Sequence, residues 1–380
     1  MNGFEVFTDF SEKININHKN INQFLKKTTL KSKKFNKFFD GYIGFFGYEI
    51  LCQFIKVKIP KQKNNNFPKS IFYKPQTIIR MGKTIKIYST IKNYRFLKDL
   101  KSSKKKFYYQ KKFRVNLSLQ QYKKIFDNCS KKIKQGKTYQ IKICQKYSNK
   151  SKINSVDFFW KLMDVNISPE AFLIRDINYS IVSCSPETLF EKKKNKIVTR
   201  PIAGTMKKTN KTSKLIAKKF FKKNEKETKE HNMIIDMERN DLSRVCKLGT
   251  VKISKLKFVE EYKDLYHYIT EISGILDNSK NTLDIIKALM PGGSVIGCPK
   301  VSTLNLLNHQ ESENRNIYTG SFGYIKSNQD MRFNLIIRSI LNFKGVCEIS
   351  VASGVVIDST AKREYQENFI KAKSLLDIFK

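Results

Sequence analysis

The stretch that decides the fold lies near the C-terminus, where residues 318–357 are YTGSFGYIKSNQDMRFNLIIRSILNFKGVCEISVASGVVI. Three runs rich in β-branched and aromatic residues, at 318–326, 332–343 and 346–357, predict three strands. Only short polar turns separate them, at 328–330 and at Lys344-Gly345. Strands joined by such turns pair antiparallel, because parallel neighbours need a long crossover. The segment therefore predicts an antiparallel sheet and not a parallel Rossmann sheet.

The rest of the chain alternates strand and helix signals. Further strands are expected at 41–50, 70–80, 84–90 and 138–147, with hairpins over 171–184 and 190–199. Apolar residues at helical spacing predict helices at 20–39, 117–135, 211–223, 225–245, 300–307 and 360–379. The Gly- and Pro-rich segment at 291–300 predicts a loop. The sequence has no internal repeat and no obvious linker, so we expect one α+β domain with large antiparallel sheets and flanking helices.

Composition narrows the class of protein. The chain has 380 residues and a formal net charge of +41, while 40% of its residues are hydrophobic. That hydrophobic content supports a sizeable core and excludes a disordered chain. The lysines are spread through nearly every segment, which does not favour a nucleic-acid-binding protein, since such proteins gather their basic residues on one face. We expect the charge to attract anionic substrates and acidic partner surfaces.

Cysteine usage and hydropathy predict a soluble cytoplasmic protein. The seven cysteines are an odd number, no CxxC pair occurs, and only four histidines are present. This pattern fits neither a disulfide framework nor a zinc cluster, but it does fit a reducing compartment. The N-terminal sequence MNGFEVFTDF lacks the basic and apolar regions of a signal peptide. No apolar run approaches the roughly 18 residues that cross a bilayer.

One acidic pair is a candidate metal site. In the stretch IVTRPIAGTMKKTNKTSKLIAKKFFKKNEKETKEHNMIIDMERNDLSRVC (197–246), Glu227 and Glu230 stand three apart on a predicted helix, so they share a face. Two carboxylates on one face suit a hard divalent cation such as Mg²⁺. The predicted turn at 201–205 carries Gly204 and Thr205, whose N–H groups and hydroxyl suit an anionic oxygen. The alternative is a solvent-exposed acidic helix.

Several motifs together resemble the chorismate-utilising enzymes, which include the large subunit of anthranilate synthase and component I of aminodeoxychorismate synthase. The motifs are RPIAGT (200–205), KEHNMIIDMERNDLSRVC (229–246), PGGSVIGCPK (291–300), YTGSFGYI (318–325), NLIIRS (334–339) and SGVVIDSTAKREYQENFIKAK (353–373). The resemblance implies one large α+β domain in which two antiparallel sheets pack together with helices outside. It makes residues 111–380 the chorismate-binding catalytic region and residues 1–110 a shortened N-terminal part of the same fold.

The resemblance also implies chorismate as substrate and Mg²⁺ as cofactor. Glu230 and Glu367 match the metal ligands, which the ring carboxylate of the substrate joins. Glu227 and Glu364 match the other acidic positions, and Glu227 is expected to donate a proton to the departing 4-hydroxyl. A divalent cation has a clear purpose here, because a dianionic substrate and paired carboxylates otherwise repel each other.

Further residues match the substrate pocket of the family. His267 matches the histidine associated with the loss of pyruvate, although a packed strand histidine is the alternative. Thr205 is grouped with the catalytic positions, and the planar guanidinium of Arg338 suits the enolpyruvyl carboxylate. The substrate-binding positions implied are Gly204, Thr205, Tyr318, Arg338, Ala352, Ser353, Gly354 and Lys371.

Two positions distinguish the branches of the family. Gln140 stands where the water-adding isochorismate and salicylate synthases place a lysine base, which disfavours those branches. Ala203 stands where many aminodeoxychorismate synthases carry a nucleophilic lysine, and alanine forms no covalent adduct. The preferred interpretation is therefore anthranilate synthase, the first step of tryptophan biosynthesis. PGGSVIG and EYQE resemble the aminodeoxychorismate branch, which remains the alternative.

The resemblance implies a partner as well. In the family, ammonia comes from glutamine that a separate amidotransferase subunit hydrolyses, and the sequence shows no nucleophilic cysteine with a following His and Glu of that kind. We therefore expect a heteromer. The competing class is a basic RNA-binding protein without catalytic activity, which would show clustered Lys and Arg with exposed aromatics and would give no role to the two Glu-x-x-Glu helices.

Overall fold

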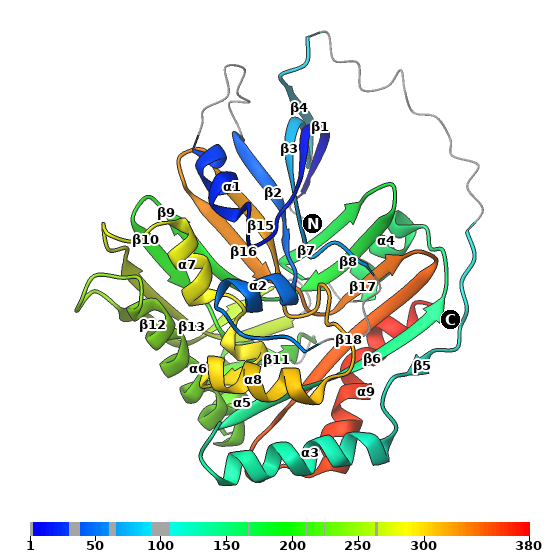
Figure 1. Cartoon of the computed structure of the whole chain (residues 1–380), viewed down its shortest axis with the longest axis vertical. Helices are drawn as coiled ribbons and strands as arrows, with labels where there is room; N and C mark the ends of the chain where they lie inside the picture. Colours follow the sequence, from blue (N-terminus) through cyan, green and yellow to red (C-terminus); the bar gives the residue numbers. More distant parts are fainter. Residues whose placement is uncertain are drawn as a thin grey trace.

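The computed structural model describes residues 3–29, 39–60, 66–92, 107–165, 168–209, 212–223, 225–262 and 265–380. The basic segment 93–106 and residues 30–38 of the predicted helix at 20–39 lie outside the described residues, and the described part of that prediction contains α1 (Ile21–Thr28). Two antiparallel sheets form the frame of the described part (Figure 1). This confirms the predicted α+β architecture.

The first sheet has eleven strands in the described part of the chain. Residues before 92 contribute β1, β2, β3 and β4, which pair with strands from the middle and end of the chain, so the N-terminal part belongs to the same domain. Along the main path the strands are β1 (Phe4–Asn15), β3 (Ser70–Met81), β2 (Gly41–Phe46), β15 (Ser321–Lys326), β16 (Met331–Leu335), β9 (Thr188–Lys193), β10 (Lys196–Thr199), β13 (Leu265–Ile275) and β11 (Ile202–Lys207), with β4 (Ile85–Ser89) on β3 and β12 (Lys252–Glu261) on β13.

The second sheet has seven strands in the described part. Its long central pair, β6 and β18, runs antiparallel over ten paired residues, from Val346↔Lys150 to Val355↔Ile141. In order, the strands are β14 (Gly297–Cys298), β6 (Gln140–Lys150), β18 (Val346–Val355), β17 (Ser339–Phe343), β8 (Tyr179–Ser185) and β7 (Glu170–Arg175), with β5 (Arg114–Val115) on β6.

The predicted single strand at 332–343 is wrong. It is two strands, β16 in the first sheet and β17 in the second, and residues 336–338 carry the chain between them. Arg338 has φ of +50°, a left-handed backbone conformation that ends a strand. The apolar run NLIIRSIL hides this break, because its residues are buried on both sides of the crossing. Short turns do join the other predicted strands.

Two further expectations are corrected. Residues 201–205 were predicted as a turn, but they open strand β11, where Gly204 pairs with Tyr268 and Thr205 with His267. The predicted strand at 41–50 ends at Phe46, and helix α2 (Tyr48–Phe54) begins after Gly47. At the second place a glycine permits a close approach that the local pattern did not reveal, because a Cβ on Gly47 would lie 2.7 Å from the carbonyl oxygen of Asn316.

Aromatic side chains fill the space between the sheets. Phe172 of the second sheet stacks on Phe322 of the first, with ring centroids 3.9 Å apart. Phe45 and Tyr179 meet edge to face in the same layer, beside buried Ile181. This interface buries large apolar side chains, and their burial stabilises the packing of the two sheets.

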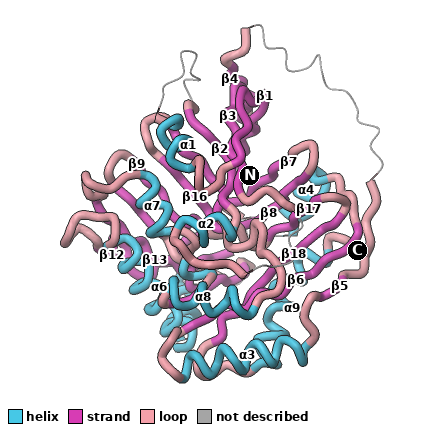
Figure 2. The backbone as a smooth tube through the Cα atoms, viewed as in Figure 1, coloured by secondary structure: helices cyan, strands magenta, loops and turns pink. Residues whose placement is uncertain are grey.

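Helices cover the outer surfaces of the sheets (Figure 2). Helix α9 (Ala361–Asp377) packs on β18 beside α3 (Leu119–Lys134), and α6 (Glu225–Ser243) packs on β11 and β13. The others are α4 (Ser155–Val165), α5 (Lys214–Lys223), α7 (Thr282–Leu289) and α8 (Lys300–Gln310). Within the described ranges no helix is long and apolar enough to cross a membrane.

Candidate functional site

Helices α6 and α9 bring the two predicted metal ligands toward one lysine. Nζ of Lys371 lies 2.8 Å from Oε1 of Glu367, one turn earlier on α9. Desolvation and then the charge of Lys142 lower the pKa of Lys371, whereas the charges of Glu367 and Glu230 act to raise it. Glu230 of α6 is therefore near enough to act on the same ammonium group, although it is far from Glu367 in sequence.

Strand β6 contributes polar groups to this place. Nε2 of Gln140 donates a hydrogen bond of 2.9 Å to Oε1 of Glu230, and Nζ of Lys142 lies 3.7 Å from the same oxygen. Both side chains leave the strand on one face, since they are two residues apart. Gln140, predicted to decide between branches, thus holds a predicted metal ligand in place.

Strand β18 lines the site with backbone. Nζ of Lys371 donates a hydrogen bond of 3.1 Å to the carbonyl oxygen of Ala352, and buried Tyr318 packs with Ala352 and Cys144. A Cβ on Gly354 would lie 2.6 Å from Nε2 of Gln140, so a larger residue there would have to move the Gln140 side chain. The neighbouring residue Ser353 directs its hydroxyl to the other side, where Oγ donates to the carbonyl oxygen of Glu364.

Strands β11 and β13 supply the predicted histidine. His267 is fully buried, and its Nδ1 lies 3.0 Å from Oγ1 of Thr205. Its Nε2 has no hydrogen-bond partner among the described residues. Desolvation, followed by the charge of Arg338, lowers the pKa of His267 to about 4, against the opposing backbone hydrogen bond at Gly204. The imidazole is therefore neutral at physiological pH, and Arg338 is close to it.

Sequence analysis missed one acidic residue at this site. Glu187 lies between β8 and β9, and desolvation raises its pKa to about 7 although Ser294, Lys142 and Arg338 act to lower it. Oγ of Ser294 donates a hydrogen bond of 3.3 Å to Oε1 of Glu187. A carboxyl group that carries its proton near neutral pH is a candidate general acid. The sequence signal was a lone glutamate inside the apolar run IVSCSPETLF (181–190).

Two predicted residues have side chains outside the described part of the structure. Glu227 lies in α6 and Ala203 in β11, but neither side chain is described, so their roles stay predictions. Glu364, the other acidic position, is 1% exposed, and its Oε1 accepts a hydrogen bond of 2.8 Å from Oγ of Ser359. Glu364 thus ties α9 to the loop before it.

The donor set fits a magnesium ion. Glu230 and Glu367 are hard oxygen ligands, and Mg²⁺ is usually held by one or two carboxylates together with water and substrate oxygens. Within the described ranges no group of three or more His, Cys, Asp or Glu side chains is arranged to hold a metal ion.

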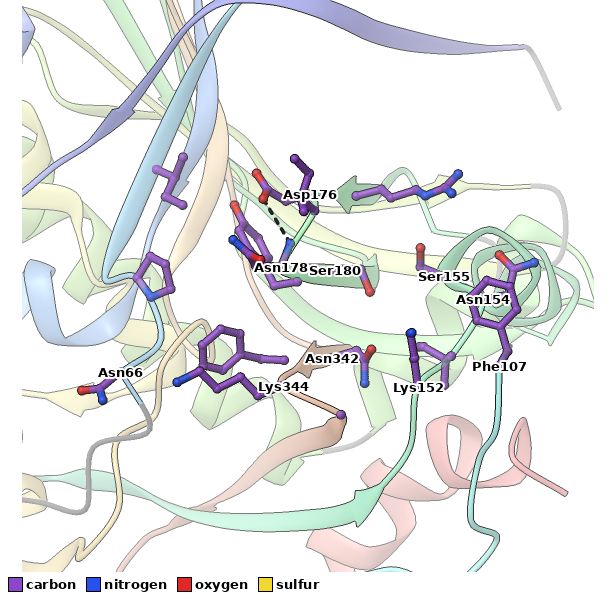
Figure 3. A pocket seen from close by; sticks show the side chains of 18 of the residues that line it. Asn66, Phe107, Lys152, Asn154, Ser155, Asp176, Asn178, Ser180, Asn342 and Lys344 are labelled. Carbon is purple, nitrogen blue, oxygen red and sulfur yellow. Dashed lines mark hydrogen bonds between the residues drawn. The ribbon is translucent and has the colours of Figure 1, made fainter. Parts of the chain in front are cut away.

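A separate groove of about 810 Å³ lies elsewhere in the fold, between the β7–β8 turn and the β17–β18 turn (Figure 3). Lys152, Asp176, Asn178 and Lys344 are among its lining residues. None of the predicted site residues lines it, and Asp176 is already paired with Lys13 at 2.7 Å. The groove is therefore separate from the site that contains Glu230 of α6 and Glu367 of α9.

Comparison with known proteins agrees with this geometry. The model of the family described as chorismate binding enzyme matches residues 4–377. The chain belongs to the chorismate-binding enzyme family. A relative from Synechocystis sp., named anthranilate synthase component I-like protein, is 31% identical over 89% of this chain and 72% of its own length.

Two further similar proteins are named for different enzymes of the chorismate-binding family. Aminodeoxychorismate synthase component 1 of Bacillus subtilis is 37% identical over 65% of this chain, which spans about half (54%) of that relative's length. The crystal structure of anthranilate synthase component I from Streptococcus pneumoniae has a TM-score of 0.83 at 24% identity, and covers 99% of this chain and 92% of its own. That likeness confirms the fold, with two packed antiparallel sheets.

Proposed function

We propose that the chain is the chorismate-converting subunit of an anthranilate synthase. The observation that carries this proposal is the meeting of Glu230, on α6, with Gln140 and Lys142, on β6, beside the Glu367–Lys371 pair of α9. A bound Mg²⁺ would offset the charge of the two carboxylates and of the dianionic substrate. The reaction would convert chorismate and ammonia to anthranilate, pyruvate and water.

The residues of the chain have distinct tasks in this proposal. Arg338 and Lys371 bind carboxylate groups of the substrate, and the backbone at Ala352 and Gly354 leaves room for its ring. A hydroxide leaves poorly without a proton donor. Glu187 has a pKa of about 7, so below that pH it carries a proton that it can donate to the departing 4-hydroxyl. Glu227, predicted from the sequence, is the second candidate for the donor. Neutral His267 accepts the proton lost when pyruvate leaves.

The choice of anthranilate over other products rests on two positions. Gln140 donates a hydrogen bond to Glu230, so its amide is committed to holding a carboxylate and supplies no base to activate water at C2. Residue 203 is alanine, so no covalent amine adduct forms there. Ammonia is left to attack C2 directly.

The second candidate is component I of aminodeoxychorismate synthase, which the named relative from Bacillus subtilis favours. The two products differ chemically, because anthranilate is aromatic and has lost pyruvate, whereas 4-amino-4-deoxychorismate keeps its enolpyruvyl group. Relatives named component I or component 1 also support our proposal of a separate amidotransferase that supplies ammonia from glutamine.

A product assay tests the proposal. The purified chain is incubated with chorismate, Mg²⁺ and ammonium salt, and products are followed by fluorescence and by mass spectrometry. We expect fluorescent anthranilate together with equimolar pyruvate. Formation of 4-amino-4-deoxychorismate without pyruvate would establish the second candidate, and unchanged chorismate under both ammonium and glutamine-amidotransferase conditions would refute both.

A further inference from the structure

Lys142 is a charged residue of the site to which the resemblance gave no role. It faces Gly354 across the β6–β18 pair, and a Cβ on Gly354 would lie 3.2 Å from its Nζ and 2.6 Å from Nε2 of Gln140. Because residue 354 is glycine and has no side chain, Nζ of Lys142 and Nε2 of Gln140 can occupy the space beside its Cα. The Lys142 side chain is 14% exposed, so its charge is largely shielded from solvent.

The ammonium group of Lys142 lies against a predicted metal ligand. Its Nζ is 3.7 Å from Oε1 of Glu230, and Nε2 of Gln140 donates to the same oxygen. The second predicted ligand, Glu367, has a similar partner in Lys371 at 2.8 Å. Each of the two carboxylates is thus paired with the ammonium group of a lysine, in the place where a divalent cation would bind.

Two cations cannot share one carboxylate oxygen without strong repulsion, because like charges a few ångströms apart repel most where water is scarce. A divalent cation that binds Oε1 of Glu230 therefore competes with Lys142 for that oxygen. The displaced ammonium group then lacks its counter-ion in a partly buried place, which is unfavourable unless another anion approaches. The substrate of the proposed function carries two carboxylates and provides such an anion.

We propose that Lys142 is an internal counter-ion of Glu230, which a divalent cation displaces and which then pairs with the anionic substrate. This inference rests on the proposed function for the identity of the substrate. It makes Lys142 a positioning residue that couples the binding of metal to the binding of substrate. Because such coupling is reciprocal, substrate tightens metal binding as much as metal tightens substrate binding.

The experiment measures Mn²⁺ binding to the full chain by electron paramagnetic resonance, with and without chorismate, at a temperature and time that limit turnover. Lys142→Met removes the charge but keeps the length of the side chain. We expect it to bind Mn²⁺ alone about tenfold more tightly than the natural chain, since one displaced ion pair of this kind corresponds to about a factor of ten. Chorismate should then tighten Mn²⁺ binding less than it does in the natural chain.

Three control variants sharpen the test. Lys124→Met removes the same charge from the exposed face of α3 and should leave Mn²⁺ affinity unchanged. Lys142→Arg keeps a cation and should bind Mn²⁺ as weakly as the natural chain. Lys142→Gln replaces Lys142→Met if the latter does not fold, as judged by circular dichroism.

The outcomes separate this inference from the proposed function. If folded Lys142→Met and Lys142→Gln bind Mn²⁺ no more tightly than Lys124→Met, the counter-ion role is refuted. Equal tightening by chorismate in the natural chain and in Lys142→Met refutes the coupling. The titration without chorismate needs no turnover, so tighter Mn²⁺ binding by Lys142→Met supports the counter-ion role even if the product assay fails.

Discussion

Oγ1 of Thr205 lies 3.0 Å from Nδ1 of His267, across the paired strands β11 and β13. Because the two residues are direct partners in the ladder, the backbone fixes their side chains on one face of the sheet. The hydroxyl orients the imidazole, and the second ring nitrogen, Nε2, is left without a partner among the described residues. In the proposed function that nitrogen is the one that would take part in proton transfer.

Thr205→Val tests this orientation. Valine keeps the shape of the side chain but removes the hydroxyl, so Nδ1 of His267 loses its partner. We expect kcat to fall about tenfold, which corresponds to about 1.4 kcal/mol, with little change in KM for chorismate. Steady-state kinetics measures both constants. Thr205→Ser keeps the hydroxyl and should retain most activity, and a Thr205→Val variant with unchanged kcat would show that the contact has no role in turnover.

The proton on Glu187 predicts a pH dependence. Burial raises its pKa to about 7, so the protonated form is present below pH 7 and is lost above it. We expect kcat to decline above pH 7, and Glu187→Gln to reduce kcat by about a hundredfold or more and to abolish that decline. Rate profiles from pH 5.5 to 9 measure this. Glu5→Gln, at an exposed ion pair with Arg80, is the matched control.

The same raised pKa has a consequence for stability. The native state holds the Glu187 proton between its unfolded pKa of about 4.5 and its folded pKa of about 7, whereas the unfolded chain has released it. The contribution of this group to stability is therefore complete below pH 4.5 and is lost as pH rises to 7. His267 acts in the opposite direction, because its lowered pKa costs stability as pH falls from 6.5 toward 4. For the rate profiles, a Glu227→Gln variant that loses the decline of kcat above pH 7, while Glu187→Gln keeps it, would identify Glu227 as the proton donor instead.

Removal of the predicted metal ligands should abolish metal binding without unfolding the chain. Glu230→Gln and Glu367→Gln keep the size of each side chain and remove its charge. Both carboxylates are about a third exposed, at 35% and 37%, so we expect thermal stability to change little. Mn²⁺ affinity should fall at least tenfold and turnover should be lost. A Glu367→Gln variant that still binds Mn²⁺ normally would remove Glu367 from the site.

Glu364 should behave differently from Glu367, three residues later on the same helix. Its carboxylate is buried and accepts a hydrogen bond from Ser359. Glu364→Ala removes the acceptor for that hydroxyl, which then keeps the N–H of Val356 as its partner, and it opens a small cavity, so we expect the free energy of unfolding to fall by about 1–3 kcal/mol. Chemical denaturation measures the loss, and Mn²⁺ titration of the folded variant should match the natural chain. Lost Mn²⁺ binding with unchanged stability would mean that Glu364 belongs to the metal site.

Local patterns were sufficient for the elements that have one buried face. Strand β15 alternates buried and half-buried residues as its hydrophobic pattern predicts, and the turn at Lys344-Gly345 has the positive φ angles that such turns require. Glu230 and Glu367, which the motifs assign to one site, both act on the ammonium group of Lys371, and a family resemblance carries such long-range information whereas a local pattern does not.

The missed features all depend on contacts between distant segments. The strand break at Arg338 joins two sheets, and both halves are apolar, so periodicity gives no sign of it. Glu187 appeared as one acidic residue among apolar ones, and only its burial in the folded chain raises its pKa, against the opposing effects of Ser294 and Arg338. The contact of Gln140 with Glu230 joins residues 90 positions apart. No spacing rule within one element predicts such a pair.

The position of α6, and with it Glu230, depends on a buried ion pair. Nζ of Lys300 lies 2.6 Å from Oδ2 of Asp241, and both side chains are at most 5% exposed. The same ammonium donates a hydrogen bond of 2.7 Å to the carbonyl oxygen of Ala288, at the end of α7. Lys300 therefore holds α6, α7 and the start of α8 together. Its charge also opposes the rise in the pKa of Glu238, which desolvation and Asp241 bring to about 8.

Lys300→Met should be among the most destabilising single changes in the chain. It leaves Asp241 buried without its partner, and the loss of one member of a buried pair typically costs about 3–5 kcal/mol. Urea denaturation measures this free energy. The double variant Lys300→Met/Asp241→Asn removes both charges and should recover part of the loss, because the remaining polar group is neutral. A loss below about 1 kcal/mol for Lys300→Met alone would mean that α6 is positioned by apolar packing against β11 and β13, and not by the pair.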